Sequence, residues 1–323
     1  MSLTRWFLAA CFLCTWPVAT TGATLLLRDE PIQPIPQPPQ LDPARVALGR
    51  RLFSDPLLSR NRTVSCASCH DLRRGGADPR GRGVGFDGQV TPLNVPTVFN
   101  AALNFRQFWN GRAESLQAQA EAVVASPTEM GGAWPDVVDR VSADPGYRRD
   151  FAGAYPDGVN RHNIADAIAS FERTLLTPNS RFDRYLQGEY SAISDQERRG
   201  YEAFKRFGCV ACHQGANVGG NMFQKFGVMR DYLRERGHDA PSDQGRFEVT
   251  GQEADRQVFK VPSLRNVALT GPYFHDGSAR TLDDAVDVMF KYQLGRIASP
   301  DDRASIILFL RTLTGELPAH VSP

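Results

Sequence analysis

The feature that most constrains this chain is a short motif of two cysteines and a histidine that occurs twice. It reads CASCH at residues 66–70 and CVACH at residues 209–213. The C-x-x-C-H pattern is the attachment signature of haem c, in which the cysteines form two thioether bonds and the adjacent imidazole ligates the iron. The sequence therefore predicts two haem groups. Their predicted attachment residues are Cys66, Cys69, Cys209 and Cys212, and their predicted proximal iron ligands are His70 and His213.

Other uses of paired cysteines fit this pattern less well. A structural zinc ion would gather four cysteines, or two cysteines and two histidines, at one point. Here the pairs lie in separate halves of the chain, and each has its own histidine. A thioredoxin-type dithiol would require a βαβ context, which the helical pattern does not provide. An exported protein with four cysteines can form two disulfides, but disulfides do not explain the histidine that follows each pair.

The first 23 residues predict export from the cytoplasm. A basic Arg5 precedes an apolar run from Trp6 to Val18, and small residues follow as far as Ala23. This is the pattern of a secretory signal peptide, so we expect cleavage near Ala23 and a periplasmic mature protein. An uncleaved membrane anchor is the alternative, but the apolar run is shorter than the roughly 20 residues that span a bilayer. Two of the six cysteines lie in this leader, which leaves only the four motif cysteines in the mature chain.

The balance of charge bears on the class of partner. The chain has 37 lysines and arginines against 36 aspartates and glutamates, for a formal net charge of +1. Nucleic-acid binding requires a clustered basic surface, and this balance gives no support to one. We therefore expect no nucleic-acid partner.

The distribution of helix signals predicts an all-α fold with long loops. After the leader, residues 24–40 are rich in proline and predict an extended arm. Helix signals recur on both sides of residue 178, and no alternating run is long enough to predict a strand. We expect two similar domains, residues 41–178 and 179–317, with one haem motif each. Helices are predicted to begin at Pro43 after Asp42, to include residues 116–123 and 164–175, and to follow the caps Ser194, Thr281 and Ser299.

Candidate ligands for the far side of each iron differ between the halves. In the second half, Met289 lies on the apolar face of a predicted helix, where its thioether would project at a buried iron. If Met289 is not a ligand, it is ordinary core filler. In the first half, residues 71–129 contain no His, Met, Lys, Tyr or Cys, so no strong ligand is near that iron. The alternatives in range of the second iron are Met222, Met229, His238 and His275.

From about Leu41 to Leu317 the sequence resembles the bacterial dihaem cytochrome c peroxidases. The matching stretches occur in the family's order and cover most of the mature chain. They include LGRRLFSDPLLS, PTVFNAALNFRQFWNGRAESLQAQA, SPTEM, EADRQVFKVPSLRNVALTGPYFHDG, TLDDAVDVM and FLRTLTGELP, together with both haem motifs. The resemblance implies two cytochrome c-like domains, each with one covalently bound haem c, around a bound calcium ion. The first haem would be peroxidatic, and the second would transfer electrons.

The resemblance also implies roles for single residues. Met289 matches the distal ligand of the second haem, and Trp109 matches a tryptophan between the haems that helps electrons pass. Gln119 and Glu129 match the pair over the peroxidatic haem, where the glutamate acts as the general acid–base. Calcium prefers oxygen donors, including backbone carbonyls. The residues that match the calcium donors are Asn94, Thr270 and Pro272.

One position departs from the family's pattern. Many members carry a histidine in the loop after the first motif, which ligates the oxidised iron and must leave before peroxide can bind. Phe86 stands at that position in this chain, and phenylalanine has no atom that ligates iron. We therefore expect the first iron to be open, or to hold only water, even when both haems are oxidised.

Together these patterns predict a periplasmic enzyme that reduces hydrogen peroxide to water. Its electrons would come from a small c-type cytochrome or a cupredoxin, and we expect a homodimer. One alternative is a dihaem oxidase that modifies a partner protein, although the best-known branch of that kind has a tyrosine where this chain has Met289. The other alternative is a dihaem cytochrome c that only carries electrons, which would not turn over peroxide.

Overall fold

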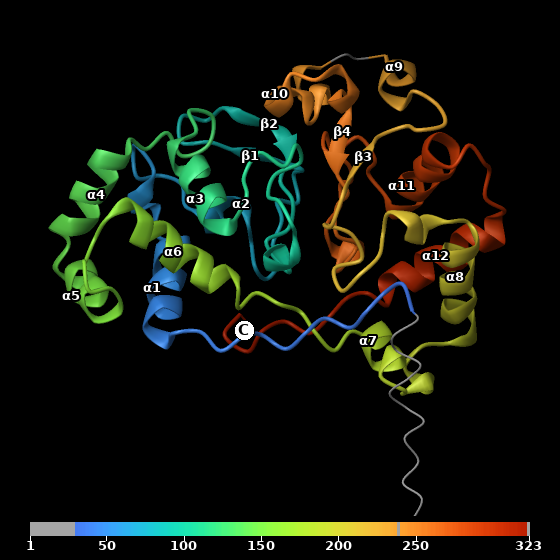
Figure 1. Cartoon of the computed structure of the whole chain (residues 1–323), viewed down its shortest axis with the longest axis horizontal. Coiled ribbons are helices and arrows are strands. Elements are labelled where there is room, and N and C mark those ends of the chain that lie inside the picture. The colour runs from blue at the N-terminus through green and yellow to red at the C-terminus, as the bar shows by residue number, and fades with distance from the viewer. Residues whose placement is uncertain (1–29, 238–239, 322–323) are drawn as a thin grey trace, which may run out of the picture. The chain divides into compact units, whose positions relative to one another are not determined.

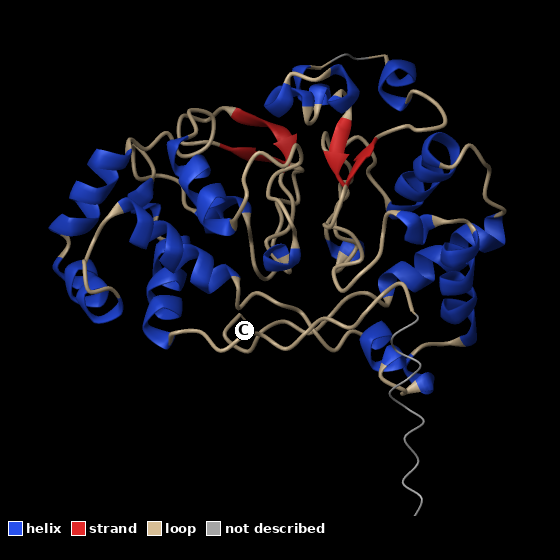
Figure 2. Cartoon of the chain, in the orientation of Figure 1, coloured by secondary structure: helices blue, strands red, loops and turns tan. Residues whose placement is uncertain are grey.

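The computed structural model describes residues 30–237 and 240–321. The predicted signal peptide, residues 1–23, lies outside the described residues, as do residues 24–29 of the predicted arm. Helices and loops dominate the structure, and its strands are short (Figure 2). The helical content confirms the predicted all-α class. In the described part of the chain, no helix is both long and apolar enough to cross a membrane.

The helices of the first half are α1 (Pro43–Ser54), α2 (Cys66–Cys69), α3 (Leu116–Ala125), α4 (Trp134–Ala143), α5 (Pro145–Ala154) and α6 (Arg161–Glu172). The start of α1 is confirmed, because Pro43 is its first residue and the Asp42 carboxylate accepts the N–H of Ala44 at 2.9 Å. Helices α1 and α3 both pack against α6 (Figure 1). The apolar core of this half lies between them and includes Leu52 and Phe171, which are almost fully buried.

The helices of the second half are α7 (Arg181–Leu186), α8 (Asp195–Arg206), α9 (Tyr232–Arg236), α10 (Phe247–Thr250), α11 (Leu282–Val288) and α12 (Pro300–Arg311). The predicted caps Ser194, Thr281 and Ser299 are confirmed, because each hydroxyl accepts a backbone N–H in the first turn of α8, α11 or α12. After α11 the chain continues into a turn of π-helix at Met289–Gln293. Such π turns are rare, and they frequently occur at functional sites.

The strands form two small antiparallel hairpins that the sequence did not predict. β1 (Arg82–Val84) pairs with β2 (Val90–Asn94), and β3 (Phe223–Lys225) pairs with β4 (Val258–Lys260). Strands of three to five residues are too short to give a clear alternating pattern. Short 3-10 turns complete the connections, at Pro56–Leu58, Ala101–Leu103, Tyr190–Ala192, Cys209–Ala211, Pro241–Gln244, Glu253–Asp255 and Val267–Leu269.

Each half contains a helix crossing that depends on a glycine. Helix α1 lies against α6, and α8 lies against α12 (Figure 1). A Cβ atom on Gly49 of α1 would overlap the carbonyl oxygen of Ala167 in α6. In the same way, a Cβ atom on Gly200 of α8 would overlap the carbonyl oxygen of Ser305 in α12. The two helix backbones therefore touch at each crossing, and in each half the first helix of the pair precedes the haem motif.

A segment after each hairpin repeats in both sequence and backbone. The first repeat matches residues 94–100 (NVPTVFN) with residues 260–266 (KVPSLRN). The second repeat, a few residues later, matches residues 107–113 (QFWNGRA) with residues 273–279 (YFHDGSA). The first and last residues of both heptapeptides QFWNGRA and YFHDGSA pair in an antiparallel bridge. The second residue of each heptapeptide, a phenylalanine, has a positive φ, of 67° in the first and 72° in the second.

The repeated segments also bind each other. In this repeat, Asn94 corresponds to Lys260 and Trp109 corresponds to His275. The N–H of Lys260 donates to the carbonyl of Trp109 at 2.8 Å, and the N–H of Asn94 donates to the carbonyl of His275 at 2.7 Å. These reciprocal hydrogen bonds join the first half of the chain to the second.

The two ends of the described chain pack on the half that is farther from them in sequence. Residues 31–40 are extended, as predicted for the arm, and Ile32 is fully buried and pairs with Gly215 in the second half. At the other end, the Nε2 atom of His320 lies 3.1 Å from the hydroxyl of Thr174, directly after α6. Each terminal segment therefore crosses from one half to the other.

Candidate functional site

The first haem motif folds as the single turn α2, with His70 directly after it. The N–H of Ser65 donates to the hydroxyl of Ser68 at 2.9 Å, which caps the start of the turn. At its end, the N–H of His70 donates to the carbonyl of Cys66 at 2.9 Å. The imidazole Nδ1 lies 3.1 Å from the carbonyl oxygen of Gly76. A hydrogen bond from Nδ1 leaves Nε2 unprotonated and free, which is what an iron ligand requires.

The second motif repeats this arrangement. The N–H of His213 donates to the carbonyl of Cys209 at 2.9 Å, and Nδ1 of His213 lies 3.4 Å from the carbonyl oxygen of Val218. Burial lowers the pKa of His213 to about 4 and also lowers the pKa of His70. Both imidazoles are therefore neutral at physiological pH, and both fit the role of a haem ligand.

The motif cysteines have the properties of attachment sites and not of redox thiols. None of the four forms a disulfide in the described chain. Burial raises the pKa of the Cys66 and Cys209 thiols to about 12, and it also raises the pKa of Cys69. A redox dithiol works through a cysteine whose pKa is lowered. The direction of the shift thus opposes the thioredoxin-type alternative.

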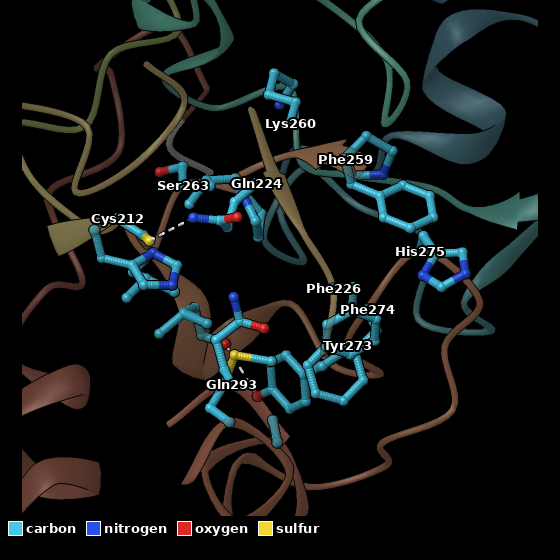
Figure 3. A pocket seen from close by; sticks show the side chains of 18 of the residues that line it. Cys212, Gln224, Phe226, Phe259, Lys260, Ser263, Tyr273, Phe274, His275 and Gln293 are labelled. Carbon is cyan, nitrogen blue, oxygen red and sulfur yellow. Dashed lines mark hydrogen bonds between the residues drawn. The ribbon is translucent and has the colours of Figure 1, made fainter. Parts of the chain in front are cut away.

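A largely apolar cavity adjoins the second motif (Figure 3). Its wall contains both cysteines and the histidine of that motif and also Met289, the first residue of the π turn. Among the described residues that line the cavity, Met289 is the only methionine. Met229 is 59% exposed and Met222 lies outside the lining, so neither competes with Met289. His238 falls outside the described residues.

The hairpin β3–β4 and the YFHDG segment form another wall of this cavity (Figure 3). The amide of Gln224 lies 3.9 Å from the Cys212 sulfur. His275 is buried, with its Nε2 atom 2.8 Å from a carboxylate oxygen of Asp243 and its ring stacked on Phe259 at 4.2 Å between centroids. The Nε2 atom of His275 is thus already in use, which argues against His275 as the ligand of the second iron and indicates a structural role.

Glu129 provides an acid close to the first motif. Burial raises the pKa of Glu129, whereas a hydrogen bond from Ser126 and the positive charge of Arg112 act in the opposite direction. Burial is the main cause of the raised pKa of both cysteines of the first motif, and the Glu129 carboxylate adds to it in each case. The Glu129 carboxylate therefore acts electrostatically on both attachment thiols. Gln119 is half-buried on α3, the helix that leads into this loop.

Phe86 packs against the same loop. Its N–H donates to the carbonyl of Glu129 at 2.8 Å, and its own carbonyl accepts a hydrogen bond from the Asn61 amide at 2.6 Å. The Phe86 ring lies against Gly131, where a Cβ atom would overlap the ring. The loop after the first motif is therefore attached to the loop that carries Glu129.

Asn94, a predicted calcium donor, binds Trp109 and another predicted donor, Pro272. The indole Nε1 of Trp109 donates to the carbonyl of Asn94 at 2.9 Å. The Asn94 amide nitrogen in turn donates to the carbonyls of Pro272 and Phe274 at 2.8 and 2.9 Å. Thr270 lines the same cavity as Asn94 and Pro272. A half turn of the amide would present its oxygen to this group of carbonyls, which is the kind of donor set that calcium takes.

The comparisons with known proteins agree with this geometry. The family model for di-haem cytochrome c peroxidase matches residues 43–191. Cytochrome c551 peroxidase of Nitrosomonas europaea is 45% identical over 303 residues, which cover 94% of this chain and 89% of that protein. The chain belongs to the di-haem cytochrome c peroxidase family. Its predicted enzyme class, cytochrome c peroxidase, and its haem c cofactors are thereby confirmed.

Two further relatives show how far the similarity extends. Cytochrome c peroxidase Ccp of Escherichia coli is 45% identical over 289 residues, which cover 89% of this chain but only 62% of that longer protein. The crystal structure of a MauG-like protein associated with microbial copper homeostasis superposes with a TM-score of 0.79 at 28% identity. That superposition covers 95% of this chain and 97% of the other. The fold of this peroxidase family therefore extends over nearly the whole chain.

Two buried ionisable residues near the haem motifs were not predicted from the sequence. Glu172, at the end of α6, is 5% exposed, and burial raises its pKa to about 8. Its charge contributes to the raised pKa of Cys66, so it lies near the first attachment site. Lys260, at the end of β4, is 7% exposed and lines the cavity of the second motif. Charged residues at these positions carry no sequence signal, because burial depends on the packing of distant segments.

Proposed function

We propose that this chain reduces hydrogen peroxide to water in the periplasm, with electrons from a small c-type cytochrome or a cupredoxin. The names of its relatives support the reaction, and the leader sequence supports the location. The overall reaction consumes one peroxide, two electrons and two protons and yields two water molecules. The observation that carries the proposal is an acid with a raised pKa, Glu129, whose charge acts on both attachment thiols of the first motif.

The residues that would hold the two haem groups divide into two sets. Cys66, Cys69 and His70 would hold the first haem, with no second protein ligand. The second haem would be held by Cys209, Cys212 and His213, and Met289 would supply a further iron ligand. When bound, haem c supplies an iron that accepts a peroxide oxygen or exchanges electrons. A thioether ligand favours ferrous iron and so a high potential, which suits an entry point for electrons.

Glu129 would act as the general acid–base. It takes a proton from one peroxide oxygen and delivers it to the other, so that the second oxygen leaves as water when the O–O bond breaks. Gln119 would hold the peroxide in position with its amide. The burial that raises the pKa of Glu129 suits this task, because a general acid–base works best when its pKa lies near the working pH, where it is both a useful base and a useful acid.

Trp109 would carry electrons between two cytochrome c-like domains, residues 41–178 and 179–317. Helix packing within each half supports this division, since α1 lies against α6 and α8 lies against α12. The hydrogen bond between the carbonyl of Trp109 and the N–H of Lys260 supports the role of Trp109, because it joins the first half to the second.

The proposal also includes a bound calcium ion and a homodimer. Asn94, Thr270 and Pro272 would bind calcium between the domains. Removal of calcium should then loosen the contact between the two halves, which small-angle scattering with and without a chelator can measure. Sedimentation of the holoprotein tests the expected homodimer.

Stopped-flow mixing of half-reduced holoprotein with peroxide tests the proposed function. The expected result is rapid reoxidation with consumption of peroxide, and steady turnover when a small c-type cytochrome or a cupredoxin is added. An electron-carrying cytochrome would show neither. An oxidase that modifies a partner protein would react with peroxide but would not turn over with these small donors.

A further inference from the structure

Lys260 is a buried cation that the proposed reaction does not use. It is the last residue of β4, and its side chain is 7% exposed. Figure 3 shows it among the side chains that line the cavity of the second motif. Lysine is almost never buried to this degree unless an anion accompanies it, because its ammonium group loses favourable hydration.

Among the described residues, none supplies an anion for Lys260. In residues 30–237 and 240–321, no aspartate or glutamate lines this cavity, and no acidic side chain forms an ion pair with Lys260. Burial alone lowers the pKa of Lys260 to about 8, with no contribution from a neighbouring charge. Two other buried basic residues of the second half each have an acidic partner. His275 is paired with Asp243, and the fully buried Arg265 is paired with Asp183.

The position of Lys260 is fixed by its neighbours. Its N–H donates to the carbonyl of Trp109, and its partner across the hairpin is Phe223. The Phe223 ring contacts Phe105 of the first half, at 5.0 Å between centroids. Residues directly opposite in a hairpin point to the same face, so Lys260 also faces the boundary between the halves. The cavity extends to this boundary, since its lining includes residues 94–97 and Trp109.

The ligand expected in this cavity has two anionic groups. Haem c is apolar over most of its surface, and its only charged substituents are two propionate side chains. An apolar cavity with one buried ammonium group and no lining carboxylate matches that distribution. We propose that Lys260 binds a propionate of one of the two haem groups at the boundary between the halves. This inference rests on the haem binding of the proposed function, but not on the reaction with peroxide.

The contact has two consequences for the haem that makes it. A positive charge beside a haem disfavours the ferric state, because ferric iron carries one more positive charge than ferrous iron. Lys260 therefore raises the midpoint potential of that haem. It also fixes the propionate edge next to the loop of Trp109, because the same residue donates its N–H to the Trp109 carbonyl.

Potentiometric titration of the holoprotein, followed by visible spectra, tests the assignment. Pyridine haemochrome first establishes that each variant carries two haem groups. In Lys260→Met, the midpoint potential of one haem should fall, and the identity of that haem shows which propionate is bound. Lys260→Arg keeps the charge and should retain a potential near that of the wild type. Lys291→Met is the matched control, because it removes the same charge from an exposed residue that does not line the cavity, and it should leave both potentials nearly unchanged.

Two results would overturn the proposal. In the first, Lys260→Met carries two haem groups and both midpoint potentials are unchanged. In the second, the midpoint potential falls as far in Lys260→Arg as in Lys260→Met. If Lys260→Met does not incorporate both haem groups, resonance Raman spectra of Lys260→Arg provide the test. The propionate bending modes of one haem should shift, and unchanged modes in both would count against the contact. These readouts need only haem attachment, so a protein inactive toward peroxide would still give a clear answer.

Discussion

The backbone N–H of Phe86 donates to the carbonyl of Glu129 across 2.8 Å. This bond links the position where many family members carry a displaceable histidine to the residue proposed as the acid–base. The Phe86 ring rests on Gly131 in the same loop, and the Asn61 amide holds the Phe86 carbonyl. The loop after the first motif is therefore fixed against the acid-bearing loop through both the backbone and the ring of Phe86.

The first prediction concerns the resting state of the first haem. Because residues 71–129 contain no strong iron ligand, the fully oxidised holoprotein should react with peroxide without prior reduction. Electron paramagnetic resonance should show one high-spin ferric signal, whereas two low-spin signals would contradict the prediction. Phe86→His should convert the high-spin signal to low spin and impose a need for reductive activation. Phe86→Leu, which offers no ligand atom, should keep the high-spin signal.

The second prediction concerns Glu129. General acid–base groups contribute typically about 10²–10⁴-fold to a rate, so Glu129→Gln should slow peroxide cleavage by a factor in that range and keep both haem groups. Glu114→Gln is the control, because the Glu114 side chain is 78% exposed and should be replaceable without effect. Near-normal turnover of Glu129→Gln in single-turnover stopped flow would exclude the residue from the mechanism.

The rate should also depend on pH through the same carboxyl group. Burial raises the pKa of Glu129 above its usual value of 4.5, and the proposed step needs the ionised form to accept a proton. The rate of cleavage should therefore fall as the pH is lowered through this raised pKa, and it should level off above it. The profile of Glu129→Gln should lack this inflection.

The third prediction concerns Met289. If its thioether ligates the second haem, Met289→Ala should lower that haem's midpoint potential and abolish the weak sulfur-to-iron band in the far red. Met229→Ala is the matched control, because Met229 is 59% exposed, and it should leave both properties unchanged. A Met289→Ala protein with the spectrum and potential of the wild type would mean that another group is the ligand.

Local chemistry accounts for what the sequence predicted well. The haem motifs, the caps at Asp42 and Ser194, and the helix that presents Met289 all depend on residues a few positions apart, and the structure has each of them. The two hairpins were missed because their strands are too short to show a pattern. Lys260 and its hydrogen bond to Trp109 were missed because the two segments that form this bond lie some 150 residues apart in the sequence. No local sequence pattern indicates that such distant segments come into contact.

The last prediction concerns the helix crossings that precede the haem motifs. Gly200→Ala places a Cβ atom where the carbonyl oxygen of Ser305 lies, so α8 and α12 must move apart. Overpacking of this kind typically costs about 1–3 kcal/mol, and Gly49→Ala should have a similar effect at the crossing of α1 with α6. Gly153→Ala is the control, because nothing lies within 4 Å of its Cβ position in α5. Replacing a glycine in a helix with alanine stabilises the helix by up to about 1 kcal/mol. Chemical denaturation of the holoproteins, followed by circular dichroism, measures the free energy of unfolding of all three variants. A Gly200→Ala protein as stable as Gly153→Ala would show that the crossing of α8 with α12 tolerates a wider separation.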